Sequence, residues 1–209
     1  AAPPGAKLAA ADAMPPPADP VNQTSSGGDF MVDVLKTLDI EYLAMNCASS
    51  FRGLHEAVIN HGGNKKPEII TCPHEEIAVH MGQGYAKMEG KPLAMICHGV
   101  VGLQHASMAM YNAWCDRVPV IVMGGNIMEA DKRAPGAEWP HSAIDPAALT
   151  RDFVKWDDQP ASLQHFAESA MRAYKISTTP PMAPTPRMCS APISDPRPSS
   201  ARPCSSGAP

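Results

Sequence analysis

The chain has 209 residues, a length that fits one domain and leaves no room for a second of ordinary size. Its 17 basic and 21 acidic residues give a net charge of −4, and it shows no basic stripe with interleaved aromatic residues, so a nucleic-acid-binding surface is not expected. Its apolar runs are of strand length and fall far short of the roughly 18 residues that span a bilayer.

The six cysteines are spread singly along the chain, and none forms a C-x-x-C pair. This spacing favours a reducing compartment and argues against a zinc site. We therefore expect a cytoplasmic protein. A processed exported form is the alternative, because the Ala/Pro-rich start of the chain resembles what often follows an export signal.

The 23 prolines are concentrated at the two ends of the chain, with six in residues 1–20, nine in residues 180–209 and eight in between. We expect a flexible leader over residues 1–24, a folded body over 25–184 and a disordered Pro/Ser-rich tail over 185–209. The tail lacks periodicity and has few apolar residues to bury. The abrupt change after residue 184 suggests a shifted reading frame or a cloned fragment.

Helical and strand patterns alternate along the body. In chain order we expect a helix at 29–38, a strand at 41–45, a helix at 50–61, a strand at 68–72, a helix at 75–89, a strand at 93–97, a helix at 103–114, a strand at 118–123, a strand at 153–156 and a helix at 162–174. The helix at 75–89 carries an apolar stripe of Ile77, Met81, Tyr85 and Met88, which we expect to face the core.

The central strands are apolar on both faces and alternate with helices, which predicts an α/β fold. We expect a three-layer sandwich in which helices cover both faces of a mostly parallel sheet. Ligands of such sheets bind beyond the carboxyl ends of the strands. The corresponding segments here are 73–75, 98–102 and 124–126.

Three segments in order carry the functional signal. They read PHEEIAVHMGQGYAKMEGKP from residue 73, CHGVVGLQHASMAMYNAWCDRVPVIVMGGN from residue 97 and HSAIDPAALTRDFVKW from residue 141. Their combined order resembles the pyrimidine-binding domain of thiamine-diphosphate enzymes of the acetolactate synthase and pyruvate oxidase type. The resemblance covers residues 25–184.

The resemblance implies that Glu75 is the catalytic and cofactor-binding carboxylate, as found by counting back from Gly84-Tyr85-Ala86. In the family this group hydrogen-bonds N1′ of the aminopyrimidine and favours its imino tautomer, in a dry site that raises the carboxyl pKa. The alternative reading of Glu75 is an ordinary acid at the start of a helix, which is also our interpretation of Glu76.

The resemblance also assigns the turn after the strand at 93–97 to the cofactor. Gly99, Val100 and Gln104 are expected to line the pyrimidine, although the family usually has Gly-Pro-Gly in this turn and Asn near residue 104. His98, His105 and Asn126 are candidates for the substrate side. A polar lining or surface role is the simpler interpretation of the two histidines.

A metal site is not predicted. His74, Glu75, Glu76 and His80 have the spacing H-E-E-x-x-x-H, which differs from the H-E-x-x-H of zinc enzymes. The adjacent Cys97 and His98 are not expected to form a nucleophilic dyad. No spacing selects Glu75 as half of a glycosidase pair.

Family members hold the diphosphate of the cofactor through Mg²⁺ in a second domain with a Gly-Asp-Gly motif, which this sequence lacks. We therefore expect the pyrimidine-binding half of a decarboxylase or carboligase acting on 2-oxo acids, completed by another domain or a separate diphosphate-binding subunit. The resemblance also implies a homo-oligomer. The alternatives are a catalytically incompetent truncated binding module and a stand-alone ester or glycoside hydrolase on the same fold.

Overall fold

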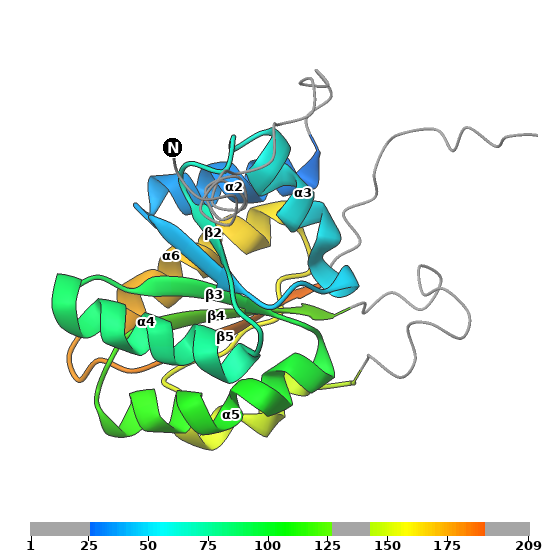
Figure 1. Ribbon diagram of the computed structural model, residues 1–209. Helices are drawn as coiled ribbons and strands as arrows, with labels where there is room; N and C mark the ends of the chain where they lie inside the picture. Colours follow the sequence, from blue (N-terminus) through cyan, green and yellow to red (C-terminus); the bar gives the residue numbers. More distant parts are fainter. Residues whose placement is uncertain (1–25, 127–142, 191–209) are drawn as a thin grey trace, which may run out of the picture.

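The computed structural model describes residues 26–126 and 143–190. They form one parallel sheet of five strands in the order β2–β1–β3–β4–β5 and five α-helices (Figure 1). The strands are β1 Tyr42–Met45, β2 Glu68–Thr71, β3 Leu93–Cys97, β4 Val120–Asn126 and β5 Thr185–Ser190. The helices are α2 Gly27–Thr37, α3 Arg52–Asn60, α4 Glu75–Glu89, α5 Val100–Cys115 and α6 Leu163–Thr178.

Helices cover the sheet on both faces, as Figure 1 shows. Side chains of β3 and β4 alternate between the two resulting cores. Met95 and Val122 pack with α4 and α5, whereas Ile96 and Met123 pack with α2, α3 and α6. The expected three-layer α/β sandwich with a parallel sheet is confirmed. None of the helices described is long and apolar enough to cross a membrane.

Polar side chains cap the starts of several helices. Ser26 and Asp29 form a reciprocal cap at α2, in which Asp29 N–H donates to Ser26 Oγ at 3.2 Å and Ser26 N–H donates to Asp29 Oδ2 at 2.7 Å. His74 caps α4, because its Nδ1 accepts the N–H of Glu76 at 3.2 Å. Helix α4 ends at Gly90, whose φ of 71° suits a glycine.

The predicted core-facing stripe of α4 is wrong for Ile77, Met81 and Met88, whereas Tyr85 packs against the core as expected. Ile77 and Met88 are 44% and 85% exposed, and the helix instead buries its small residues, among them Ala78, Gly82 and Ala86. A Cβ on Gly82 would lie 3.3 Å from Val120 Cγ1, so α4 approaches β4 closely. The close approach explains why the larger apolar side chains face outward.

Two other stretches differ from the prediction. The expected strand at 153–156 does not form: Phe153 ends a short 3-10 helix over Arg151–Phe153, and residues 154–156 are in no helix or strand. Residue 185 was expected to open the disordered tail, but Thr185–Ser190 forms β5, which pairs in parallel with β4. Main-chain pairing does not require an apolar sequence, and Pro186 is tolerated because β5 is an edge strand. The leader, the rest of the tail and His141-Ser142 lie outside the described residues.

Candidate functional site

Glu75 is the first residue of α4 and lies just beyond the carboxyl end of β2. Glu75 is only 3% exposed, although charged residues are seldom fully buried without partners. Helix α5 approaches it at a glycine, and a Cβ on Gly102 would lie 3.0 Å from Glu75 Oε1. The absence of a side chain at Gly102 therefore leaves room for the carboxylate.

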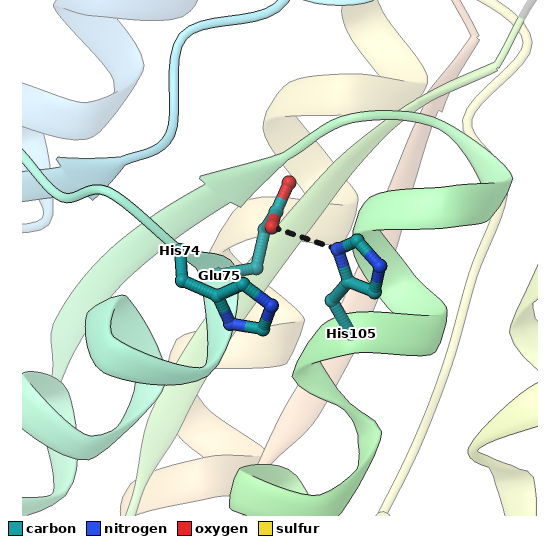
Figure 2. Close-up of side chains that lie close together, drawn as sticks. All are labelled: His74, Glu75 and His105. Carbon is teal, nitrogen blue, oxygen red and sulfur yellow. Dashed lines mark hydrogen bonds and ion pairs between the residues drawn. The ribbon is translucent and has the colours of Figure 1, made fainter.

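Polar partners converge on the Glu75 carboxylate from two other elements. His105 of α5 places Nδ1 3.2 Å from Glu75 Oε2, and its N–H must donate because an ionised carboxylate only accepts. The side chain of Asn46, directly after β1, also hydrogen-bonds Glu75. The ring of His74 stacks on that of His105, with centroids 4.8 Å apart and planes 22° from parallel (Figure 2).

These partners determine the charge of the carboxyl group. Burial raises the pKa of Glu75, but hydrogen bonds from its own backbone N–H, His105 and Asn46 outweigh burial and hold the pKa below its usual range. The expected raised pKa is therefore wrong for the chain in this state. The dry site is present, but its donors favour the ionised form.

A hydrogen bond to Ser50 fixes the turn between β3 and α5. Gly99 is buried and precedes the first residue of α5, and its N–H donates to Ser50 Oγ at 3.2 Å. Ser50 also contacts the end of β4, where a Cβ on Gly125 would lie 2.5 Å from its carbonyl oxygen. Ser50 therefore connects the carboxyl ends of β3 and β4.

The remaining predicted residues are spread around this end of the sheet. Val100 opens α5 and is half-buried, as is His98, whereas the side chain of Gln104 is exposed. Asn126 ends β4 and is 3% exposed; its Nδ2 donates to the Ala143 carbonyl at 3.4 Å, and its Oδ1 has no hydrogen-bond partner among the described residues. Of the substrate-side candidates, His105 is the one that contacts Glu75 directly.

Asn46 and Ser50 are the polar neighbours that the sequence prediction missed. Both follow β1, and the rule that ligands bind beyond the carboxyl ends of parallel strands applied there as well. Ser50 was instead assigned to the helix predicted at 50–61. The structure has a separate 3-10 turn over Ser49–Phe51 before α3. This turn places Ser50 next to Gly99 and Gly125.

A shallow groove with mostly apolar walls lies elsewhere, between α2 and α6. Its lining includes Phe30, Leu163 and Met171 and does not include Glu75. It belongs to the face of the sheet opposite α4 and α5. The groove is therefore not part of the polar cluster at the strand ends.

A parallel α/β sandwich with a buried carboxylate at its strand ends defines a ligand-binding domain of the open-sheet class. Residues 25–149 match the family described as "Thiamine pyrophosphate enzyme, N-terminal TPP binding domain". The match covers more than half of the chain, and the chain belongs to this family, as the motifs predicted.

Relatives support the same assignment. The chain is 27% identical over 141 residues to benzoylformate decarboxylase of Pseudomonas aeruginosa, covering 63% of this chain and 26% of that protein. It is 26% identical over 123 residues to acetolactate synthase of Bacillus subtilis, covering 59% of this chain and 21% of that protein. The chain thus spans about a quarter of the length of these relatives.

Solved structures show the same fold. The crystal structure of benzoylformate decarboxylase from Polynucleobacter necessarius superposes with a TM-score of 0.68 at 18% identity, covering 80% of this chain and 30% of that one. A putative thiamin diphosphate-dependent enzyme from Mycobacterium smegmatis gives the same TM-score at 20% identity, covering 80% and 31%. At these identities the likeness concerns the fold alone.

Proposed function

We propose that this chain is the pyrimidine-binding half of a thiamine-diphosphate-dependent decarboxylase or carboligase that acts on 2-oxo acids. The observation that carries the proposal is the buried Glu75 carboxylate, held at the strand ends by His105 and Asn46 and facing Gly102. The names of the related decarboxylase and synthase support this reaction class.

The residues present are compatible with the aminopyrimidine of the cofactor. An ionised Glu75 is an acceptor for a protonated ring nitrogen, and its burial strengthens such a bond. Gly99 and Val100 form the turn at the start of α5, next to the Gly102 gap. When bound, thiamine diphosphate supplies the carbanion chemistry that breaks or forms the bond beside the carbonyl of a 2-oxo acid.

The chain's own groups have separate tasks in this proposal. Glu75 holds the proton of the pyrimidine N1′, and His105 orients the carboxylate by donating to Oε2. Asn126 offers Oδ1 to a polar group on the substrate side, because this buried atom has no partner among the described residues. The Mg²⁺ and diphosphate contacts come from a further domain or a partner chain, in line with the greater length of the relatives.

Binding of thiamine, which carries the pyrimidine without the diphosphate, tests the proposal. In amide NMR spectra of the chain, we expect thiamine to shift the signals of Glu75, Gly99 and Gly102. Glu75→Gln should weaken this binding at least tenfold. Glu76→Gln removes the neighbouring, more exposed acid and should bind like the parent. Equal binding by all three chains would contradict the proposal, as would shifts confined to the groove between α2 and α6.

We further propose that two copies of the chain associate through the outer surface of α4 and α5. Both helices carry large apolar side chains that are more than a third exposed: Ile77, Met81, Met88, Val101, Met108 and Tyr111. A large exposed apolar surface on two neighbouring helices marks an interaction site in many proteins. A self-complementary contact of one face with its copy is the simplest symmetric solution.

Light scattering at micromolar concentration tests this association. We expect a dimer for the parent chain and a monomer for the double variant with Ile77→Glu and Met108→Glu. Met171→Glu places the same charge on α6, on the other side of the sheet, where Met171 is 62% exposed. The control should remain dimeric, and a monomeric parent would overturn the proposal.

A further inference from the structure

Glu75 lies in a cluster with two histidines, and these side chains are of the types that bind metal ions. His74, Glu75 and His105 each place one metal-ligating atom within 4.8 Å of the others. Figure 2 shows both imidazole rings beside the carboxylate, with His74 and Glu75 at the start of α4 and His105 on α5. We propose that these three side chains form a binding site for a zinc ion.

The set of donors matches the chemistry of zinc. Two imidazoles and one carboxylate are the three protein ligands of a common class of zinc site, which leaves a fourth position open. The 3.2 Å between His105 Nδ1 and Glu75 Oε2 is already close to the roughly 3.3 Å edge of a tetrahedron with zinc–ligand bonds of about 2.0–2.1 Å. When Nδ1 binds zinc, the ring proton resides on Nε2, and the shared ion replaces the hydrogen bond to Glu75. The remaining separations must shorten, and the His105 side chain, 49% exposed, is not enclosed by the core, which leaves space for that adjustment.

Charge and surroundings favour a cation at this point. The start of α4 carries the positive end of a helix dipole, but the buried Glu75 carboxylate supplies the compensating negative charge. Asn46 hydrogen-bonds the same carboxylate and holds it in place, as outer partners of metal ligands do. The low exposure of Glu75 limits competition from water.

The histidine that joins His74 and Glu75 in the structure is His105 and not His80. In the sequence, His80 lies six residues after His74, which precedes the helix, and this spacing did not predict a metal site. In the structure, His80 Nε2 lies 3.2 Å from Asn112 Nδ2 at an exposed position. His105, which is distant in sequence, takes its place beside Glu75. The proposed site therefore depends on the packing of α4 against α5.

Binding has a specific effect on the start of α4. His74 Nδ1 now accepts the N–H of Glu76, so the ring proton resides on Nε2. A zinc ion bound to Nε2 moves that proton to Nδ1, which can then no longer accept. Glu76 N–H therefore loses its cap when zinc binds, and this gives the site a signature of its own.

Zinc and the pyrimidine compete for the same carboxylate. This consequence rests on the proposed function, whereas zinc binding itself does not. If both proposals hold, zinc-loaded chain binds thiamine at least tenfold more weakly, and adding a chelator restores binding.

Calorimetry with zinc chloride on the chelator-treated chain, with accessible thiols alkylated, tests the site. We expect one zinc ion per chain, and at least a tenfold loss of affinity in Glu75→Gln, His105→Gln and His74→Asn. Asn is itself a good helix cap, so His74→Asn removes the imidazole while keeping α4 capped. His80→Asn is the matched control and should bind like the parent. Circular dichroism checks that every variant is folded.

The outcomes separate the two proposals. The zinc site is overturned if the folded parent binds no zinc, or if the three variants bind it as the parent does. It is also overturned if zinc leaves the Glu76 amide signal unchanged. Zinc binding without any thiamine binding would leave the site standing and remove the proposed function instead.

Discussion

Gly102 lies so close to Glu75 that a Cβ at residue 102 would be 3.0 Å from Glu75 Oε1. The same Cβ would lie 3.0 Å from Cys97 Cβ and 3.1 Å from His98 Cβ. Neither the end of β3 nor the start of α5 can move away freely, because both belong to the core. The carboxylate therefore occupies a space that only glycine leaves open.

The substitution Gly102→Ala tests this relationship. Crowding of a packed site is expected to reduce the free energy of unfolding by about 1–3 kcal/mol, measured by urea denaturation. Gly84→Ala is the control, because Gly84 is exposed in α4 and a Cβ there meets nothing within 4 Å. That change should stabilise the chain by roughly 0.5–1 kcal/mol. Equal effects at the two glycines would contradict the crowding described at Glu75.

Ser50→Ala should loosen the turn between β3 and α5. It removes the acceptor of the Gly99 N–H, and leaving a part-buried donor without a partner costs about 1–3 kcal/mol. We expect that loss in urea unfolding, together with faster hydrogen exchange of the Gly99 amide. Ser49→Ala changes the exposed neighbour and should stay within about 0.5 kcal/mol of the parent. Unchanged Gly99 exchange in Ser50→Ala would show that the bond does not protect this turn.

Tyr85 should ionise only at very high pH. Burial and the hydrogen bond to Glu41, at 2.6 Å, raise the pKa of Tyr85 to about 12. Because the folded pKa is raised, the associated stability is complete below the ordinary tyrosine pKa of about 10 and is lost as the pH rises through about 12. Ultraviolet titration should show this component in the parent and not in Tyr85→Phe. Glu41→Gln should shift it to lower pH, and an unshifted midpoint there would exclude Glu41 as a cause.

Glu75 predicts the opposite pH dependence. Its folded pKa is lowered, so the stability contributed by the ionised carboxylate is present above the unfolded pKa, about 4.3, and is lost as the pH falls through the folded value. The parent should therefore lose free energy of unfolding relative to Glu75→Gln as the pH falls from about 5 toward 3. Denaturation of both chains across that range measures the difference. A difference that does not change with pH would mean that Glu75 has the same pKa folded and unfolded.

The sequence predicted β1 to β4, whose apolar runs carry a clear signal, but it missed β5 and placed a strand at 153–156 that does not form. The segment Leu93–Cys97 is apolar throughout, and its predicted bounds agree with β3. Helix α4 also has its predicted bounds, yet its buried side was misassigned. Its sequence holds two stripes that a helix could bury, one of large residues and one of small residues, and periodicity alone cannot choose between them. The close approach of Gly82 to Val120 decides the matter, and it depends on tertiary packing.

For the candidate site, the sequence predicted the position of the carboxylate but not its hydrogen-bond partners. Glu75 was predicted from its motif, and it lies at the start of α4, beyond the carboxyl end of β2 as expected; its role toward the cofactor stays a prediction. Its partners were not predicted, because His105 and Asn46 come from 30 residues after and 29 residues before it. Which side chain meets the carboxylate depends on the rotation of α5 about its axis, and a single sequence contains little information on that rotation.

Strand β5 has a practical consequence for anyone who shortens this chain. Its backbone pairs with residues Ile121 to Asn126 of β4, so a chain cut at residue 184 turns β4 into an edge strand with open main-chain donors and acceptors. Because the side chains of β4 are buried throughout, such an edge would be long and apolar, the kind that recruits strands from other molecules. A shortened chain should therefore keep residues 185–190 rather than end at the change in composition.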